Sequence, residues 1–309
     1  MNSNQTEWIL ELKAQGMSSR EIASIVGCSK STVNYVIKGR PKKNQRLDGP
    51  RILFFDLENT PSIGASFQRW KVNLSQDSII REGGSLLSAC WKFNGDTKVT
   101  KAVLTSAEAI KDNDARIICE LYEAWEQADM VVAHNAKRFD VPLFKTRLLY
   151  LGLPPPKTVK VIDTLEIVKK LKFNSNKLDS LCRTLDIGSK MEHEGIELWL
   201  NCMAGNGKAL KKMVDYNEKD VLLLEELYHI IKPFDTNPHN AAHFFKDNKQ
   251  RCPVCGSENL TPTGSMVYTP VSEFEELSCG DCGHRSRKRN VLNSKEKRAS
   301  LLVTPKASG

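Results

Sequence analysis

The chain has 309 residues, of which 40% are hydrophobic and 27% are charged, which is typical of a globular protein and excludes a disordered or fibrous class. No apolar run approaches the length of a membrane span, and the first residues lack the basic and apolar regions of a signal peptide. We therefore expect a cytoplasmic protein without a membrane partner.

The net charge of +8 is unevenly distributed along the chain. Residues 1–50 hold eight Lys/Arg against four Asp/Glu, and residues 283–309 hold eight against one, which leaves residues 51–282 near −3. Basic flanks of this kind are typical of segments that bind phosphate backbones. We expect nucleic-acid affinity to reside there, although the C-terminal flank could equally serve only solubility.

The N-terminal residues predict three helices, at Thr6–Ala14, Ser19–Val26 and Lys30–Lys38, with a turn at Gly27 and an N-cap at Ser29. This pattern is similar to the helix-turn-helix of resolvases and small transcription factors, in which the second helix of the motif enters the major groove. The resemblance implies that DNA is contacted by Lys30, Ser31, Asn34 and Tyr35. Use of the same fold for protein contact is the alternative.

After a basic linker, residues 51–104 predict a buried strand from Ile52 to Phe55 followed by a hairpin of two strands. Asp56 and Glu58 follow the first strand two positions apart, so on an extended backbone both carboxylates leave the same face. Adjacent carboxylates repel unless a cation lies between them, which favours a metal site. Two unrelated acids at a strand end are the other interpretation.

Further along, residues 114–127 predict a helix and Met130–Ala133 a buried strand. Asp140 opens the next helix, where it could be a metal ligand or only an acid at a helix start. Tyr216 and Asp220 are four apart on a predicted helix at Lys208–Ile231, so they share one face. The leucines after Asp220 place this turn against the core, where an unpaired Asp is costly.

These residues, in order and spacing, resemble the three motifs of the DEDD superfamily of 3′–5′ exonucleases, tyrosine subtype, over about residues 51–234. The motifs are Asp56-x-Glu58, Asn135-x-x-x-Phe139-Asp140 and Tyr216-x-x-x-Asp220. The chain is most similar to predicted exonucleases that are related to the proofreading domain of family B DNA polymerases and are common in bacteriophage. Accessory landmarks are Trp91-Lys-Phe93, Asp163-Thr164, Ser175-Asn-Lys-Leu178 and Leu198-Trp199. Residues 62–84 match nothing in this pattern.

The resemblance implies a ribonuclease H-like mixed sheet flanked by helices, and hydrolysis of nucleic acid, with DNA favoured, in a bacterial or phage-infected cytoplasm. It also implies that two Mg²⁺ or Mn²⁺ ions are held by Asp56, Glu58, Asp140 and Asp220, while Tyr216 orients the attacking water and Asn135 contacts nucleic acid. We expect Asp163 to cap a helix and His134 to have a structural role.

Four of the nine cysteines form two Cys-x-x-Cys pairs, Cys252/Cys255 and Cys279/Cys282, each followed by glycine. Four thiolates in this pattern predict a structural zinc ribbon, with a long hairpin between the pairs. A redox role and ligation by His284 are weaker alternatives. The other five cysteines lie in apolar surroundings and are interpreted as core thiols.

The fold class is therefore predicted as α/β, with a small all-α N-terminal domain and a C-terminal zinc ribbon. The predicted boundaries are 1–40 for the helix-turn-helix, 41–50 for the linker, 51–234 for the exonuclease domain, 235–250 for a second linker, 251–288 for the ribbon and 289–309 for a disordered basic tail. The competing functions are a structure-specific endonuclease on the same fold, a catalytically silent DNA-binding regulator, and an adaptor whose ribbon binds protein.

Overall fold

The structure, a computed structural model, describes residues 3–27, 33, 36, 37, 49–67, 70 and 72–305. Two compact units are distinguished, one that holds the central sheet and extends to Leu227, and one that begins at Tyr228. Within the described ranges, no helix is both long enough and apolar enough to cross a membrane.

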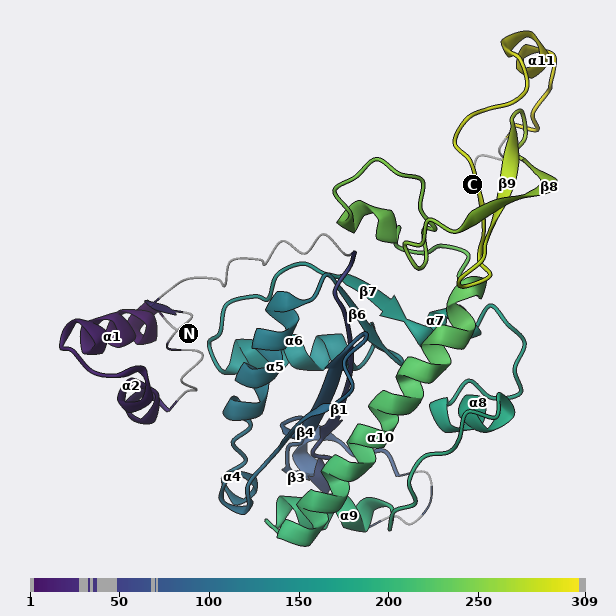
Figure 1. Cartoon of the computed structure of the whole chain (residues 1–309). Coiled ribbons are helices and arrows are strands. Elements are labelled where there is room, and N and C mark those ends of the chain that lie inside the picture. The colour runs from purple at the N-terminus through teal and green to yellow at the C-terminus, as the bar shows by residue number, and fades with distance from the viewer. Residues whose placement is uncertain are drawn as a thin grey trace. The chain divides into compact units, whose positions relative to one another are not determined.

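The first unit is built on a five-stranded mixed sheet in the order β5-β4-β1-β6-β7 (Figure 1). β1 pairs antiparallel with β4 and parallel with β6, β4 and β5 form the predicted hairpin, and β7 pairs parallel with β6. The strands are β1 (Ile52–Asn59), β4 (Leu86–Phe93), β5 (Thr100–Val103), β6 (Met130–Ala133) and β7 (Lys160–Asp163). β1 is longer than predicted, so Asp56 and Glu58 lie within the strand rather than after it.

Seven helices of the first unit accompany this sheet (Figure 1). They are α4 (Ser106–Ile110), α5 (Ala115–Gln127), α6 (Asp140–Tyr150), α7 (Thr164–Val168), α8 (Leu178–Thr184), α9 (Ile196–Met203) and α10 (Gly207–Ile231), the last of which continues into the second unit. The mixed sheet with its flanking helices confirms the predicted ribonuclease H-like class.

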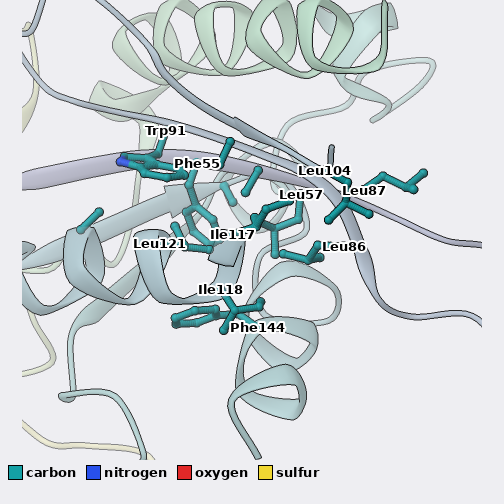
Figure 2. Close-up of a cluster of buried hydrophobic side chains, with 14 of the residues drawn as sticks. Phe55, Leu57, Leu86, Leu87, Trp91, Leu104, Ile117, Ile118, Leu121 and Phe144 are labelled. Atoms are coloured by element: carbon teal, nitrogen blue, oxygen red, sulfur yellow. The ribbon is translucent and has the colours of Figure 1, made fainter. Parts of the chain in front are cut away.

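The two faces of β1 have different partners because its side chains alternate. Phe55 and Leu57 face a buried cluster that includes Ile117 and Leu121 of α5 and Phe144 of α6 (Figure 2). Asp56 and Glu58 therefore point to the opposite face. α10 lies across that face, where the thiol of Cys90 on β4 donates to the carbonyl of Val214, 3.7 Å away.

The described residues between 62 and 84 include one short pair of strands, for which the sequence suggested no structure. β2 (Ile63–Gly64) pairs antiparallel with β3 (Ile79–Arg81), and a short 3₁₀ helix, Gln76–Ser78, precedes β3.

Two of the three predicted N-terminal helices lie in the described residues, α1 (Ser3–Ala14) and α2 (Ser19–Val26). Ser18 and Glu21 form a capping box at the start of α2, and Gly27 ends it in the left-handed conformation (φ 71°). The predicted third helix, the Ser29 cap, and the DNA-contact candidates Lys30, Ser31, Asn34 and Tyr35 lie outside the described residues, apart from Val33, Val36 and Ile37 of that helix.

The second unit contains a three-stranded sheet in the order β10-β9-β8 and two 3₁₀ helices, Lys232–Phe234 and Ala241–Phe244. The antiparallel strands β8 (Leu260–Tyr268) and β9 (Glu273–Cys279) are the predicted long hairpin, and β10 is Arg285–Arg287. The tail expected to be disordered contains α11 (Lys295–Ala299) instead. Ser294 caps this helix by accepting from the backbone of Lys297, a local signal that the prediction overlooked.

Candidate functional site

Three acids from two distant elements meet on the α10 side of the sheet. Carboxylate oxygens of Asp56, Glu58 and Asp220 all lie within 4.8 Å of one another. Burial raises the pKa of Asp56 to about 7, and the charge of Asp220 adds to the rise. The pKa values of Glu58 and Asp220 are also raised, in both cases first by burial. Such a cluster is stable as carboxylates only with a positive partner.

Asp140 lies at the edge of this cluster. It is the first residue of α6 and is 1% exposed, so it is a buried acid at a helix start. Burial and the charge of Asp56 raise its pKa, while backbone N–H groups of Asp140 itself and Leu57 act in the opposite direction. Among the described residues, Oδ1 of Asp140 and Oδ1 of Asp220 have no hydrogen-bond partner although both are buried. These free oxygens fit a hard divalent cation.

Lys190, which sequence reasoning missed, inserts an ammonium group among the acids. Its Nζ donates to Oδ2 of Asp220 in a short contact and to the hydroxyl of Tyr216 at 3.0 Å. Burial alone would lower the pKa of Lys190, but Asp220 and Asp56 outweigh it, so its pKa is raised and the charge is kept. The loop before α9 carried no pattern that pointed to this role.

Tyr216 and Trp199 line the cluster with aromatic rings. The Tyr216 hydroxyl hydrogen-bonds Asp220, and burial, reinforced by the charge of Asp220, raises its pKa to about 12. A phenol of such high pKa is a donor and not a general base near neutral pH. The Trp199 side chain hydrogen-bonds Glu58, which stabilises that carboxylate.

Asn217 fixes the orientation of Asp56. Its Nδ2 donates to Oδ2 of Asp56 at 2.5 Å, while the hydroxyl of Ser88 on β4 donates to its Oδ1 at 3.2 Å. Ser88 and Asn217 are both fully buried. The Ser88 hydroxyl therefore sets the orientation of the amide, and the amide holds one oxygen of Asp56. No local sequence pattern predicts this chain of contacts.

The loop that carries the second acidic motif is organised by Asp163. Its carboxylate accepts from the backbone N–H groups of Asn135, Lys137 and Leu165, the last of which is the predicted helix cap. His134 contacts Thr164 at 2.9 Å and the carbonyl of Asn176 at 2.8 Å, and burial lowers its pKa. Both residues have the structural roles that we expected, and Asn135 lies in this loop with a positive φ of 69°.

The four cysteines of the second unit also converge. Their Sγ atoms lie within 4.8 Å of one another, with 3.6 Å between Cys252 and Cys282 and between Cys255 and Cys279. Roughly 3.8 Å is the sulfur separation of a tetrahedral zinc site with 2.3 Å bonds. Burial raises the pKa of Cys252, Cys255 and Cys282 to about 11, so a cation is needed to keep these thiols deprotonated.

Both cysteine pairs form the same turn. Gly256 and Gly283 have φ near 77° and 78°, and their N–H groups donate to the carbonyls of Cys252 and Cys279 at 2.9 Å. His284 instead engages the carbonyl of Pro233 through Nδ1 at 2.8 Å. The cluster in the structure is therefore the four-cysteine set, without His284.

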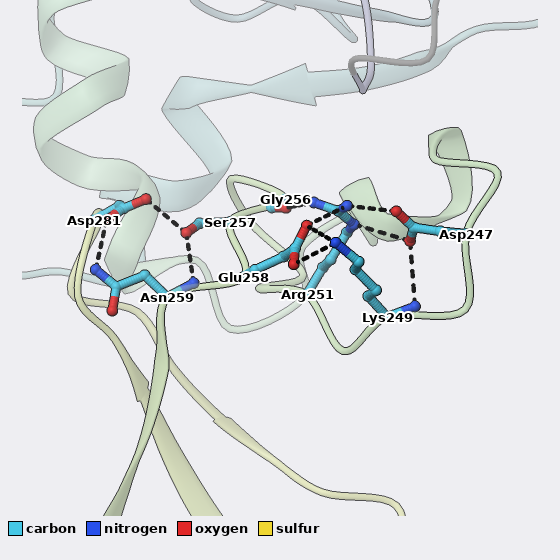
Figure 3. A network of polar contacts seen from close by, with 8 residues as sticks. All are labelled: Asp247, Lys249, Arg251, Gly256, Ser257, Glu258, Asn259 and Asp281. Atoms are coloured by element: carbon cyan, nitrogen blue, oxygen red, sulfur yellow. Dashed lines mark hydrogen bonds and ion pairs between the residues drawn. The ribbon is translucent and has the colours of Figure 1, made fainter.

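Polar contacts around the first turn connect it to the second (Figure 3). Arg251 donates to Asp247 and Glu258, both at 2.6 Å, and to the carbonyl of Gly256 at 3.1 Å. Asp281, between the second pair of cysteines, accepts from Ser257 at 2.6 Å and from Asn259 at 2.8 Å. The apolar cluster of this unit consists mainly of the cysteines themselves, so it offers little core without a metal.

One comparison with known proteins agrees with the fold of the first unit. Residues 81–232, just under half the chain, match a family model described as the RNase_H superfamily. One similar solved structure is the family B DNA polymerase from the hyperthermophilic archaeon Pyrobaculum calidifontis, with a TM-score of 0.43 and 15% identity. That similarity covers 60% of this chain and 25% of the polymerase chain. No curated protein matches the chain.

The sheet topology and the family match identify a ribonuclease H-like fold in the first unit. An acidic group and a four-cysteine group that could each bind metal belong to the same chain.

Proposed function

We propose that this protein is a metal-dependent 3′–5′ exonuclease that hydrolyses phosphodiester bonds of nucleic acid, with DNA as the favoured substrate. The observation that carries the proposal is the convergence of Asp56, Glu58 and Asp220 within 4.8 Å, although Asp220 is more than 160 positions from the other two. Its support is the resemblance of these residues, with Asp140 and Tyr216, to the tyrosine-subtype DEDD motifs.

In this proposal Asp56, Glu58, Asp140 and Asp220 would hold two divalent cations, Mg²⁺ or Mn²⁺, and the chemistry supplied by the bound ions would be activation of water and stabilisation of negative charge on the phosphate. Tyr216 donates its hydroxyl proton in a hydrogen bond and orients the water. Lys190 favours the ionised form of Asp220, since its ammonium contacts that carboxylate.

We further propose that Cys252, Cys255, Cys279 and Cys282 bind one structural Zn²⁺, and that the N-terminal helices bind DNA. The eight cysteines in the described residues are all free, which fits a reducing cytoplasm.

The test is cleavage of a 5′-labelled single strand of DNA or RNA by the full chain in Mg²⁺. A 3′–5′ exonuclease shortens the labelled strand stepwise from its 3′ end and leaves a circular single strand intact. The matched control is Asp215→Asn, because Asp215 lies on α10 but pairs with Lys211 outside the cluster. Asp220→Asn should abolish cleavage and Asp215→Asn should not. Cutting of the circle would identify an endonuclease. If no Mg²⁺-dependent cleavage occurs, the proposal is wrong and the protein is better described as a catalytically silent DNA-binding regulator.

A further inference from the structure

A strongly basic segment lies inside the acidic central region. Residues 137–190 contain twelve Lys/Arg against five Asp/Glu, although residues 51–282 as a whole are near −3. The expectation that nucleic-acid affinity resides in the flanks was based on that average charge and did not consider this basic segment. Binding depends on the local charge that a strand meets, because salt screens charges beyond about 10 Å.

The fold gathers part of this charge where β6 and β7 end. We call Arg138, Lys169, Lys172 and Lys177 the carboxyl-edge surface. All four are exposed, and no ion pair to another described residue involves any of them. Four cationic side chains without an ionic partner among the described residues repel one another, so they favour binding of an anionic partner.

His134 holds the two parts of this surface together. Its ring contacts Thr164, at the start of α7, and the carbonyl of Asn176, just before α8, at 2.9 and 2.8 Å. The loop that follows His134 carries Arg138, and the chain between α7 and α8 carries the three lysines. The backbone segments that carry these side chains are therefore held next to each other at the end of the sheet.

The surface also borders the acid cluster. Arg138 lies two residues before Asp140, the buried first residue of α6 at the edge of that cluster. Phe139, between Arg138 and the buried Asp140, is 41% exposed. An aromatic ring beside basic side chains fits an unpaired base next to its phosphate.

From this arrangement, and resting on the proposed nuclease function, we propose that the carboxyl-edge surface binds the backbone of a single-stranded nucleic acid whose 3′ end reaches the acid cluster. The lysines and Arg138 contact successive phosphates, and Phe139 contacts a base. The core thus contributes affinity of its own, in addition to the basic flanks.

The test measures anisotropy of a labelled twelve-nucleotide oligo(dT), using the zinc-loaded full chain without added Mg²⁺ or Mn²⁺, so that no cleavage is needed. The triple variant Lys169→Gln/Lys172→Gln/Lys177→Gln is compared with Lys98→Gln/Lys111→Gln/Lys208→Gln. The second set removes the same charge from exposed lysines elsewhere in the unit. The first variant should bind about tenfold or more weakly at low salt, and its salt slope should fall by about 2, roughly 0.7 per lost contact. The second should resemble wild type.

Equal losses in both variants would overturn the proposal, since net charge alone would then explain binding. Phe139→Leu should weaken binding of the single strand more than binding of a duplex of equal length. A larger loss for the duplex would also contradict the proposal. Competition by polyglutamate as strong as by DNA would assign the surface to acidic proteins. If binding depends on this surface but the protein cleaves no nucleic acid, the proposed nuclease function is wrong and the proposed binding surface is still supported.

Discussion

The acid cluster predicts that removing one charge stabilises the metal-free protein. In Asp56→Asn the new side chain has the same shape, and its carbonyl oxygen can still accept from Asn217, which donates to Asp56 at 2.5 Å. What is lost is a negative charge beside Glu58, Asp140 and Asp220. Because those neighbours are buried and repel Asp56, the substitution relieves strain rather than creating a cavity.

The size of the effect follows from the pKa of Asp56, which is about 7 in the fold against an ordinary 3.8. The folded state binds the proton more tightly than the unfolded state, so stability falls as pH rises from about 4 to about 7. A shift of about three units corresponds to about 4 kcal/mol. Asp56→Asn should therefore gain up to about 4 kcal/mol at pH 8 and less than half of that at pH 5.

The assay is urea unfolding at both pH values, without added divalent cation, of wild type, Asp56→Asn and the control Asp96→Asn, whose side chain is exposed in the β4–β5 turn. Mn²⁺ should then stabilise the wild type, by about 2.7 kcal/mol at one hundred times the dissociation constant, and should barely affect Asp56→Asn. A variant no more stable than wild type at pH 8, or a gain that is the same at both pH values, would refute this reasoning.

Three further predictions concern residues that support the two candidate metal sites. Asn217→Leu, of similar shape, should weaken Mn²⁺ binding about 10- to 100-fold in calorimetry because Asp56 loses its hydrogen-bond donor; unchanged affinity would exclude a positioning role. Lys190→Met should lower the unfolding temperature of the metal-free protein while enlarging the increment on adding Mn²⁺, since the acids lose their internal cation; an unchanged increment would contradict this. Cys279→Ser should reduce bound zinc, measured after denaturation with a colorimetric chelator, from one equivalent to near zero and remove the strand signal of the second unit; retention of both would show that metal is not its support.

Local patterns in the sequence were sufficient where neighbours along the chain decide the structure. Strand alternation placed Asp56 and Glu58 on one face, and the helical period placed Tyr216 beside Asp220. The cap at Asp163 and the two Cys-x-x-Cys turns are equally local, and the structure contains all of them. The sheet class followed from the order of these elements.

Other features depend on residues that are distant in the sequence. The contact of Asn217 with Asp56 spans 161 positions, and that of Lys190 with Asp220 spans 30 positions and joins an irregular loop to α10. Neither residue type is distinctive, since a lysine in a loop or an asparagine in a helix is ordinarily solvated. Only packing of α10 onto β1 removes water from both side chains and gives them a charged partner.

The sequence by itself therefore determined which acids and thiols are candidates for metal binding, because short-range periodicity fixes the side on which each one lies. The tertiary structure alone decided that three of the acids meet, that Asp140 stays at their edge, that Lys190 enters the cluster, and that scattered lysines form one surface. The physical reason is that burial and electrostatic interaction depend on distances in space, which are set by long-range packing rather than by spacing along the chain.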